Sequence, residues 1–134
     1  MIIYLHGFAS SSHSSKAAYF GQRFRERRVE FEAPDLNLPD FSTLTITRMI
    51  DQVHELIAAE REPATLIGSS LGAFVAVNIA AKWPELVRSL ILLAPALDLR
   101  DLGGDQLQAW RSSGHMLIWS CFISSSTRYV LMSV

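Results

Sequence analysis

The stretch Ala64-Thr65-Leu66-Ile67-Gly68-Ser69-Ser70-Leu71-Gly72 decides the fold of this 134-residue chain. Residues 64–68 form a short apolar run, as expected of a strand buried in a sheet. The apolar residues from Leu71 onward predict a helix that ends near Lys82, shortly before Pro84. Residues 68–72 fit the pattern G-x-S-x-G, in which a serine stands on a sharp turn between a strand and a helix. The stretch therefore predicts a strand-turn-helix unit with Ser70 at its bend.

Ser70 is the candidate nucleophile of this unit. The first N–H groups of a helix have no partner within the helix and favour negative charge, so the Leu71 backbone N–H is a candidate oxyanion donor. Gly68 and Gly72 suit the bend because a Cβ at either position would collide with neighbouring elements. The pattern is typical of acyl transfer through a serine hydroxyl.

A second oxyanion donor is predicted in the loop after the first strand. The apolar run from Ile2 to Leu5 predicts a strand that ends at His6-Gly7-Phe8. We assign the second donor to the Phe8 N–H, with Gly7 allowing close approach of the backbone. We favour a structural role for His6, a buried ring that fixes the loop, over a catalytic base, because the base follows the nucleophile in chain order in this type of site.

Short apolar runs alternate with amphipathic stretches up to about Ala96. Further strands are predicted around residues 29–33 and 89–93, and further helices around residues 17–27 and 44–57. His54, between two apolar positions of the second helix, is interpreted as structural or exposed rather than as a ligand. This alternation indicates βαβ units, and hence a single α/β domain with a parallel sheet.

Composition narrows the classes of partner. With 49% hydrophobic and 19% charged residues the chain is expected to fold, and a net charge of −1 gives no reason to expect nucleic acid or an anionic membrane. One cysteine, Cys121, and four scattered histidines match no metal-ligand spacing. No phosphate loop or dinucleotide motif is present. We therefore expect a small uncharged ligand, no metal and no cofactor and, from an N-terminus without a basic leader, a cytoplasmic location.

Four segments of the chain resemble those of the YqiA-like esterases of the α/β-hydrolase superfamily. The matching segments are Tyr4-Leu5-His6-Gly7-Phe8, Pro34-Asp35-Leu36, Ile67-Gly68-Ser69-Ser70-Leu71-Gly72 and Leu92-Leu93-Ala94-Pro95-Ala96. The resemblance covers roughly residues 1–114 and implies a three-layer fold, with a mainly parallel sheet between helices. It also implies hydrolysis of short-chain carboxylic esters through an acyl-enzyme on Ser70, with the Phe8 and Leu71 amides as oxyanion hole.

Residues 115–134 depart from this family pattern. The family continues through two strands that carry the triad acid and then the triad histidine, and neither is recognisable here. Only His115 follows Ser70 among the histidines. We therefore expect an incomplete domain with an atypical tail, truncated or out of frame, and an impaired esterase. We also expect self-association through the sheet edge beside residues 89–93 unless the tail covers it.

Two alternatives to an esterase stay open. A thioesterase or acyltransferase uses the same serine turn and differs only in the acyl donor or acceptor. A non-catalytic remnant or binding module is favoured by the missing triad residues.

Overall fold

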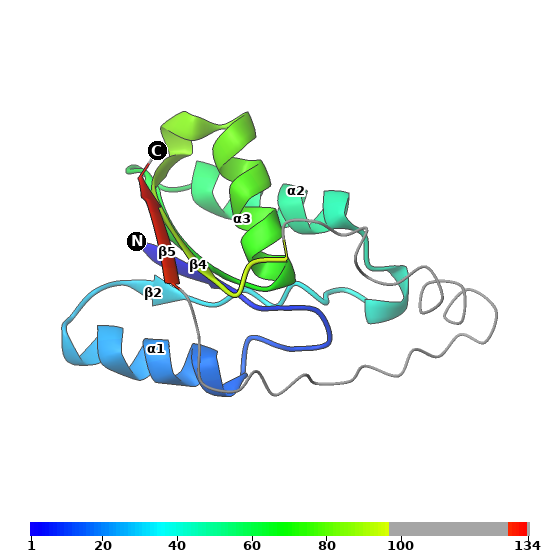
Figure 1. Cartoon of the computed structure of the whole chain (residues 1–134), viewed down its shortest axis with the longest axis horizontal. Coiled ribbons are helices and arrows are strands. Elements are labelled where there is room, and N and C mark those ends of the chain that lie inside the picture. The colour runs from blue at the N-terminus through cyan, green and yellow to red at the C-terminus, as the bar shows by residue number, and fades with distance from the viewer. Residues whose placement is uncertain (97–128, 134) are drawn as a thin grey trace.

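A mainly parallel sheet forms the centre of the molecule (Figure 1). The computed structural model describes residues 1–96 and 129–133, and within them the strand order is β2-β1-β3-β4-β5. Neighbours among β1 to β4 pair in parallel, whereas β5 pairs antiparallel with β4. The bounds are β1 Ile2–Leu5, β2 Phe31–Glu32, β3 Ala64–Ser69, β4 Val87–Leu93 and β5 Tyr129–Ser133.

Helices cover both faces of this sheet, α1 on one and α2 with α3 on the other (Figure 1). Helix α1 spans Ser15–Glu26, α2 Ile46–Ala58 and α3 Leu71–Lys82, and two short 3-10 helices are η1 Phe41–Thr43 and η2 Pro84–Leu86. Side-chain oxygens of Ser14 and Thr45 accept hydrogen bonds from the first turns of α1 and α2. Such caps satisfy N–H groups that a helix leaves unpaired, so both helices begin where the sequence supplies a cap.

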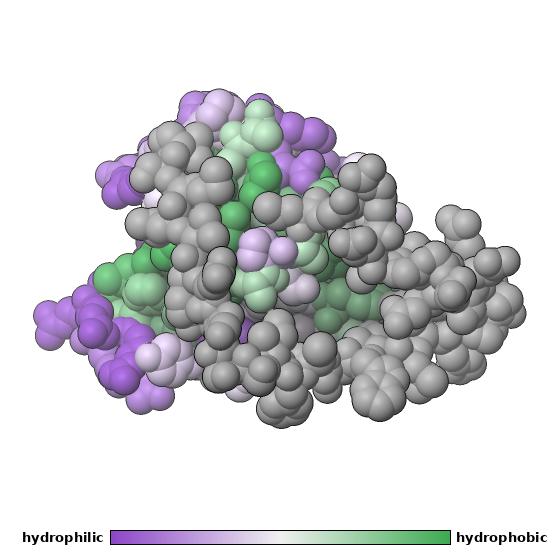
Figure 2. Space-filling view, viewed as in Figure 1, coloured by the Kyte–Doolittle hydropathy of each residue, from purple (hydrophilic) through white to green (hydrophobic). Residues whose placement is uncertain are grey.

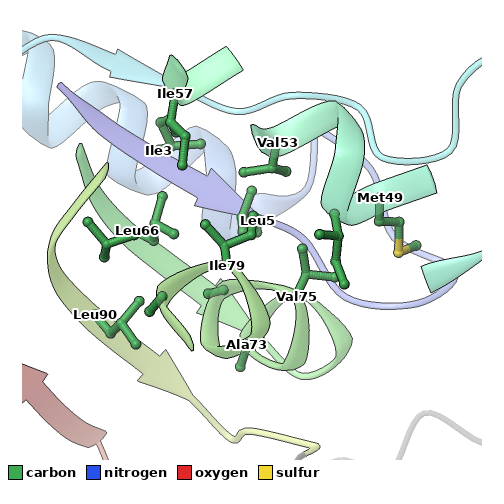
Figure 3. Close-up of a cluster of buried hydrophobic side chains, with 14 of the residues drawn as sticks. Ile3, Leu5, Met49, Val53, Ile57, Leu66, Ala73, Val75, Ile79 and Leu90 are labelled. Carbon is green, nitrogen blue, oxygen red and sulfur yellow. The ribbon is translucent and has the colours of Figure 1, made fainter. Parts of the chain in front are cut away.

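The larger part of the core lies between the sheet and the pair α2 and α3 (Figure 3). Strands β1 and β3 alternate their side chains between the two faces, so Ile3 and Leu66 point to this cluster while Tyr4 and Ile67 join a smaller one under α1. Each fully buried aliphatic side chain contributes about 1.5–3 kcal/mol. Buried residues of the larger cluster include Ile3, Leu5, Met49, Val53, Ile57, Leu66, Ala73, Val75, Ile79 and Leu90.

The predicted fold class is confirmed: a mainly parallel sheet lies between helices on both faces. The helix predicted from Leu71 to about Lys82 has those bounds. The strand predicted around residues 29–33 is shorter than expected, because Arg28 adopts φ 56° and the Val29 N–H donates to Phe24 O at 2.9 Å. Val29 thus closes a Schellman-type end of α1 instead of extending β2.

The tail supplies a partner for the edge that was expected to be open. Strand β5 of the tail pairs with β4 from Ser89 to Leu93. The tail therefore covers the edge through which self-association was expected if it stayed open. Self-association itself stays a prediction. Residues 97–128 and 134, with His115, Cys121 and the acids after β4, lie outside the described residues.

On the face shown in Figure 2, the hydrophilic surface lies toward the ends and the apolar surface lies in the middle. Hydrophilic side chains gather over the end of α1 and over the upper helices, and apolar ones show between them near the sheet. None of the helices in residues 1–96 has the length and apolar character needed to cross a bilayer.

Candidate active site

Ser70 occupies a sharp bend between β3, which ends at Ser69, and α3, which begins at Leu71. Its backbone has φ 53° and ψ −114°, a conformation that non-glycine residues rarely adopt. The Ser70 side chain makes no capping hydrogen bond to α3, and the residue is exposed between a buried Ser69 and a buried Leu71. The hydroxyl of Ser70 therefore projects from the carboxyl edge of the sheet.

The two glycines around this bend are required by close approach of other backbone. A Cβ added to Gly68 would lie 2.4 Å from the Ala73 Cα, and a Cβ added to Gly72 would lie 2.1 Å from the Leu5 carbonyl oxygen. Real Cβ atoms do not come this close to backbone. Gly72 therefore allows the start of α3 to pack directly on the end of β1.

The loop after β1 lies beside Ser70. A Cβ built on Gly7 would be 3.2 Å from the Ser69 carbonyl oxygen and 3.9 Å from the Ser70 Oγ. The Ser10 N–H donates to Gly7 O at 3.2 Å, and Ala9 has φ 52°, so the loop turns sharply just after Phe8. The structure thus brings His6-Gly7-Phe8 next to the bend. The oxyanion roles of the Phe8 and Leu71 N–H groups stay predictions.

His6 is buried, with both ring nitrogens engaged by backbone. Its Nδ1 lies 2.9 Å from Gly7 O, and its Nε2 lies 3.0 Å from the Leu36 backbone N. A neutral ring that donates from Nδ1 and accepts at Nε2 satisfies both contacts, an assignment made from the partners. Because Nε2 already accepts from Leu36, the Asp35 carboxylate 3.4 Å away is a neighbour and not a hydrogen-bonded ion pair. The ring joins the loop after β1 to residues 35–36.

Residues 35–40 are in turn held by α2. Gln52 Nε2 donates to Asp35 O at 3.0 Å, and Arg48 Nη2 donates to Asp40 O at 3.0 Å. Asn37 Nδ2 donates to Ser10 O at 2.8 Å, which ties the same segment to the serine-rich loop of residues 10–15. No chemical role was predicted for Asp35, and the contacts of Arg48 and Gln52 were not predicted from the sequence. Arg48 and Gln52 lie four residues apart and therefore on one side of α2, and this spacing was the sequence signal that they contact the same segment.

Tyr4 lies beneath the bend on the α1 face. Burial raises the pKa of its hydroxyl, and hydrogen-bonding influence from the Ser69 and Ser14 side chains acts in the opposite direction. The hydroxyl is therefore protonated at neutral pH and able to donate. Ser69 contributes to this buried polar contact, whereas Ser70 faces outward.

The remaining histidines of the described part lie in other settings. The His54 ring stacks on Trp83 with centroids 3.9 Å apart, and His13 is exposed in the serine-rich loop. Within residues 1–96 and 129–133 no group of three or more His, Cys, Asp or Glu side chains could hold a metal ion.

Backbone strain collects at the edge that carries Ser70. Non-glycine residues with positive φ in the described part are Ala9, Arg28, Ser70 and Ala94. Three of them, Ala9, Ser70 and Ala94, follow β1, β3 and β4, whose carboxyl ends meet at one edge because the strands are parallel. Strain of this kind gathers at functional sites, where surrounding contacts hold it. The geometry marks this edge as the candidate active site.

A family model described as uncharacterised protein family UPF0227 matches residues 1–120. The chain belongs to UPF0227. The family resemblance drawn from the sequence is thereby confirmed. Two curated relatives match this UPF0227 chain over residues that include part of the site region. Pyrrolizixenacetamide deacetylase of Xenorhabdus hominickii is 44% identical over 86 residues, 63% of this chain and 32% of the relative.

A UPF0227 protein of Pasteurella multocida (strain Pm70) is 34% identical over 79 residues, 55% of this chain and 40% of the relative. The chain thus matches less than half the length of either relative.

Among solved structures, an α/β-superfamily protein of Xanthomonas campestris pv. campestris, described as a candidate hydrolase, superposes with a TM-score of 0.62 at 27% identity. That match covers 76% of this chain and 62% of the other. The fold of this UPF0227 chain is that of the α/β hydrolases.

Proposed function

We propose that this UPF0227 chain carries a serine hydrolase site that acts on short-chain carboxylic esters through an acyl-enzyme on Ser70. The observation that supports it best is the backbone of Ser70, held at φ 53° between a strand and a helix with its side chain exposed. The 44% identical relative named as a deacetylase supports hydrolysis of an acyl bond.

In the proposed reaction the Ser70 Oγ attacks the ester carbonyl carbon and loses its proton to a base. The carbonyl oxygen becomes an oxyanion held by the Phe8 and Leu71 N–H groups. Collapse of the tetrahedral intermediate breaks the C–O bond to the alcohol, whose oxygen takes the proton back from the base as it leaves. Water then releases the acid from Ser70 by the same steps. Loss of one such N–H donor costs about 10² to 10³ in rate, so the position of both loops matters.

We further propose that turnover of this chain is impaired. His6 has both nitrogens engaged and His54 is stacked on Trp83. His13 precedes the nucleophile, on an exposed loop. Among the described residues no histidine follows Ser70, and His115 lies outside them. A serine without a base is a poor nucleophile, and hydrolases that lose a triad member keep only about 10³ to 10⁴ over the uncatalysed rate.

Hydrolysis of 4-nitrophenyl acetate and butyrate by the wild-type chain, Ser70→Ala and Ser69→Ala tests this proposal. We expect the wild-type chain to release nitrophenol slowly and Ser70→Ala to release none above background. The matched neighbour Ser69→Ala should keep its rate within about twofold of wild type. Rapid turnover removed by Ser70→Ala would show that a base is supplied and would overturn the impairment. Equal rates in all three would overturn the serine mechanism and favour a non-catalytic remnant or binding module.

A second candidate activity is deacetylation of an amide, favoured by the name of the 44% identical relative. A matched pair of an aryl acetate and the corresponding aryl acetamide distinguishes the two. The ester proposal predicts release from the acetate alone, because the aryloxide leaving group needs less protonation than an amine; release from the acetamide that Ser70→Ala removes would instead show amide deacetylation. Thioesterase and acyltransferase activities use the same serine and are tested with an acyl thioester and an added alcohol.

A small uncharged ester remains the proposed partner, with neither nucleic acid nor membrane. The net charge of −1 supports this choice. A cytoplasmic location is part of the same proposal.

A further inference from the structure

Residue 70 is bound through both of its backbone polar groups to the turn that follows β4. The Ser70 N–H donates to Leu93 O at 3.0 Å, and the Ala96 N–H donates to Ser70 O at 3.3 Å. Between these two partners Ala94 has φ 44°. The chain therefore bends at Ala94, just after β4, so that the Leu93 carbonyl and the Ala96 N–H both contact residue 70.

These two hydrogen bonds act on the two peptide planes that flank Ser70. The Ser70 N–H belongs to the plane that it shares with the Ser69 carbonyl, and the Ser70 carbonyl belongs to the plane that carries the Leu71 N–H. Two planes fixed at one Cα leave φ and ψ of that residue little freedom. The bond from Ala96, added to the α3 bonds from the Ala73 and Phe74 N–H groups, therefore helps to fix the direction of the Leu71 N–H, the candidate oxyanion donor.

A residue such as Ser70 relaxes from positive φ unless its surroundings hold it, because its Cβ clashes with neighbouring backbone there. Within α3 the Ser70 carbonyl also accepts from Ala73 N–H at 3.0 Å, which any helix start would provide. The bond to Leu93 O is the last one of the β3–β4 ladder, so the bond from Ala96 is the contact specific to this bend.

We propose that the 93–96 turn is a positioning element for the nucleophile, with Ala94 and Ala96 as positioning residues. The inference rests on the proposed function in treating Ser70 as the nucleophile. Ala94 acts by adopting the positive φ that bends the chain, and Ala96 acts by donating its N–H to Ser70 O. Both act through the backbone of residue 70, which aims the Oγ and the Leu71 N–H.

Ala96→Pro and Ala96→Ser in the full chain test this proposal. Proline removes the N–H donor, whereas serine keeps it with a side chain of similar size. We expect Ala96→Pro to lower the second-order rate of fluorophosphonate labelling at Ser70 by about tenfold to hundredfold, the effect of a small misplacement of a reacting group. Ala96→Ser should label within about twofold of wild type.

A second pair of variants guards against a simple loss of folding. Ala94→Val and Arg28→Val each place a β-branched side chain at a positive φ, of 44° and 56° respectively. Both should lower the melting temperature, but only Ala94→Val should slow labelling at Ser70. If Arg28→Val slowed labelling as much as Ala94→Val, the effect would be one of stability and the proposal would be overturned.

Hydrogen exchange of peptides that cover residues 68–74 separates this proposal from the serine chemistry. We expect faster exchange there in Ala96→Pro and Ala94→Val than in Ala96→Ser and Arg28→Val, with unchanged exchange across α1. If wild type is not labelled but this exchange difference is seen, the serine chemistry fails and the positioning element stands. Unchanged exchange in residues 68–74 of both test variants would overturn the positioning element, whatever the labelling.

Discussion

The Leu36 N–H donates to the His6 Nε2 over 3.0 Å, which joins two residues that lie 30 positions apart in the chain. The other ring nitrogen contacts Gly7 O at 2.9 Å. One buried imidazole therefore links the segment after β2 to the loop beside Ser70. This arrangement accounts for a histidine at the end of β1 without giving it a proton-transfer step.

His6→Ala should destabilise the protein by about 2–4 kcal/mol, since it leaves the buried Leu36 N–H without its acceptor and opens a cavity. The free energy of unfolding in urea measures this. His13→Ala is the matched control, because that ring is exposed, and should change stability by less than about 0.5 kcal/mol. Equal stability of the two variants would contradict the linking role of His6.

Gly72→Ala should be among the most damaging single-methyl changes, with a loss of about 3 kcal/mol or more. The added Cβ would lie 2.1 Å from the Leu5 carbonyl oxygen, and backbone cannot move aside as a side chain can. In Gly21→Ala the nearest atom is the Phe31 Cε1 of a side chain, at 3.3 Å. That control should be close to neutral, because alanine also favours the helix by about 1 kcal/mol. Thermal unfolding compares the pair.

Tyr4 should make stability depend on alkaline pH. Burial raises its folded-state pKa above the ordinary value of 10.0, so folding favours the protonated hydroxyl. The resulting stabilisation is present below pH 10.0 and is lost as the pH rises through the folded-state pKa. Urea unfolding between about pH 8 and pH 11 should show a smaller decline in Tyr4→Phe than in wild type. A wild-type-like decline in Tyr4→Phe would rule this coupling out.

Arg48→Leu should loosen residues 37–43 and cost about 1–2 kcal/mol. Its guanidinium donates to Thr43 O at 3.0 Å and to Asp40 O at 3.0 Å, so the variant leaves backbone carbonyls of this segment without these donors. Hydrogen exchange across residues 37–43 is the measurement. Arg23→Leu is the control, since that side chain lies on the surface of α1 beside Glu26. Slow exchange retained in Arg48→Leu would contradict the role of Arg48.

Local patterns predicted the parts of the fold whose causes are local. The residues around Ser70 specify the end of β3 and the start of α3, because glycines at 68 and 72 and the apolar rhythm of residues 71–82 act over short distances. The late start of β2 was not predicted, since the positive φ at Arg28 occupies a position where glycine is the usual signal.

Contacts across long stretches of chain could not be read from such patterns. Backbone groups make the bond of Leu36 to His6 and the bonds of Ser70 to Leu93 and Ala96. Every residue carries such groups, so the residue types in the sequence do not predict these bonds. The pairing of β5 with β4 likewise depends on a tail whose composition gave no strand pattern. Tertiary arrangement decides these contacts, so a single sequence predicts the bend but not what holds it.

Covalent labelling with a fluorophosphonate reports whether the Ser70 hydroxyl is a nucleophile presented by a strained bend. Because a serine without a base reacts slowly, the labelling is run over hours, and peptide mass spectrometry of the folded chain should then find the adduct on Ser70, retained in Ser69→Ala and absent in Ser70→Ala. A folded wild-type chain without any adduct, or an adduct that persists in Ser70→Ala, would contradict this role of Ser70.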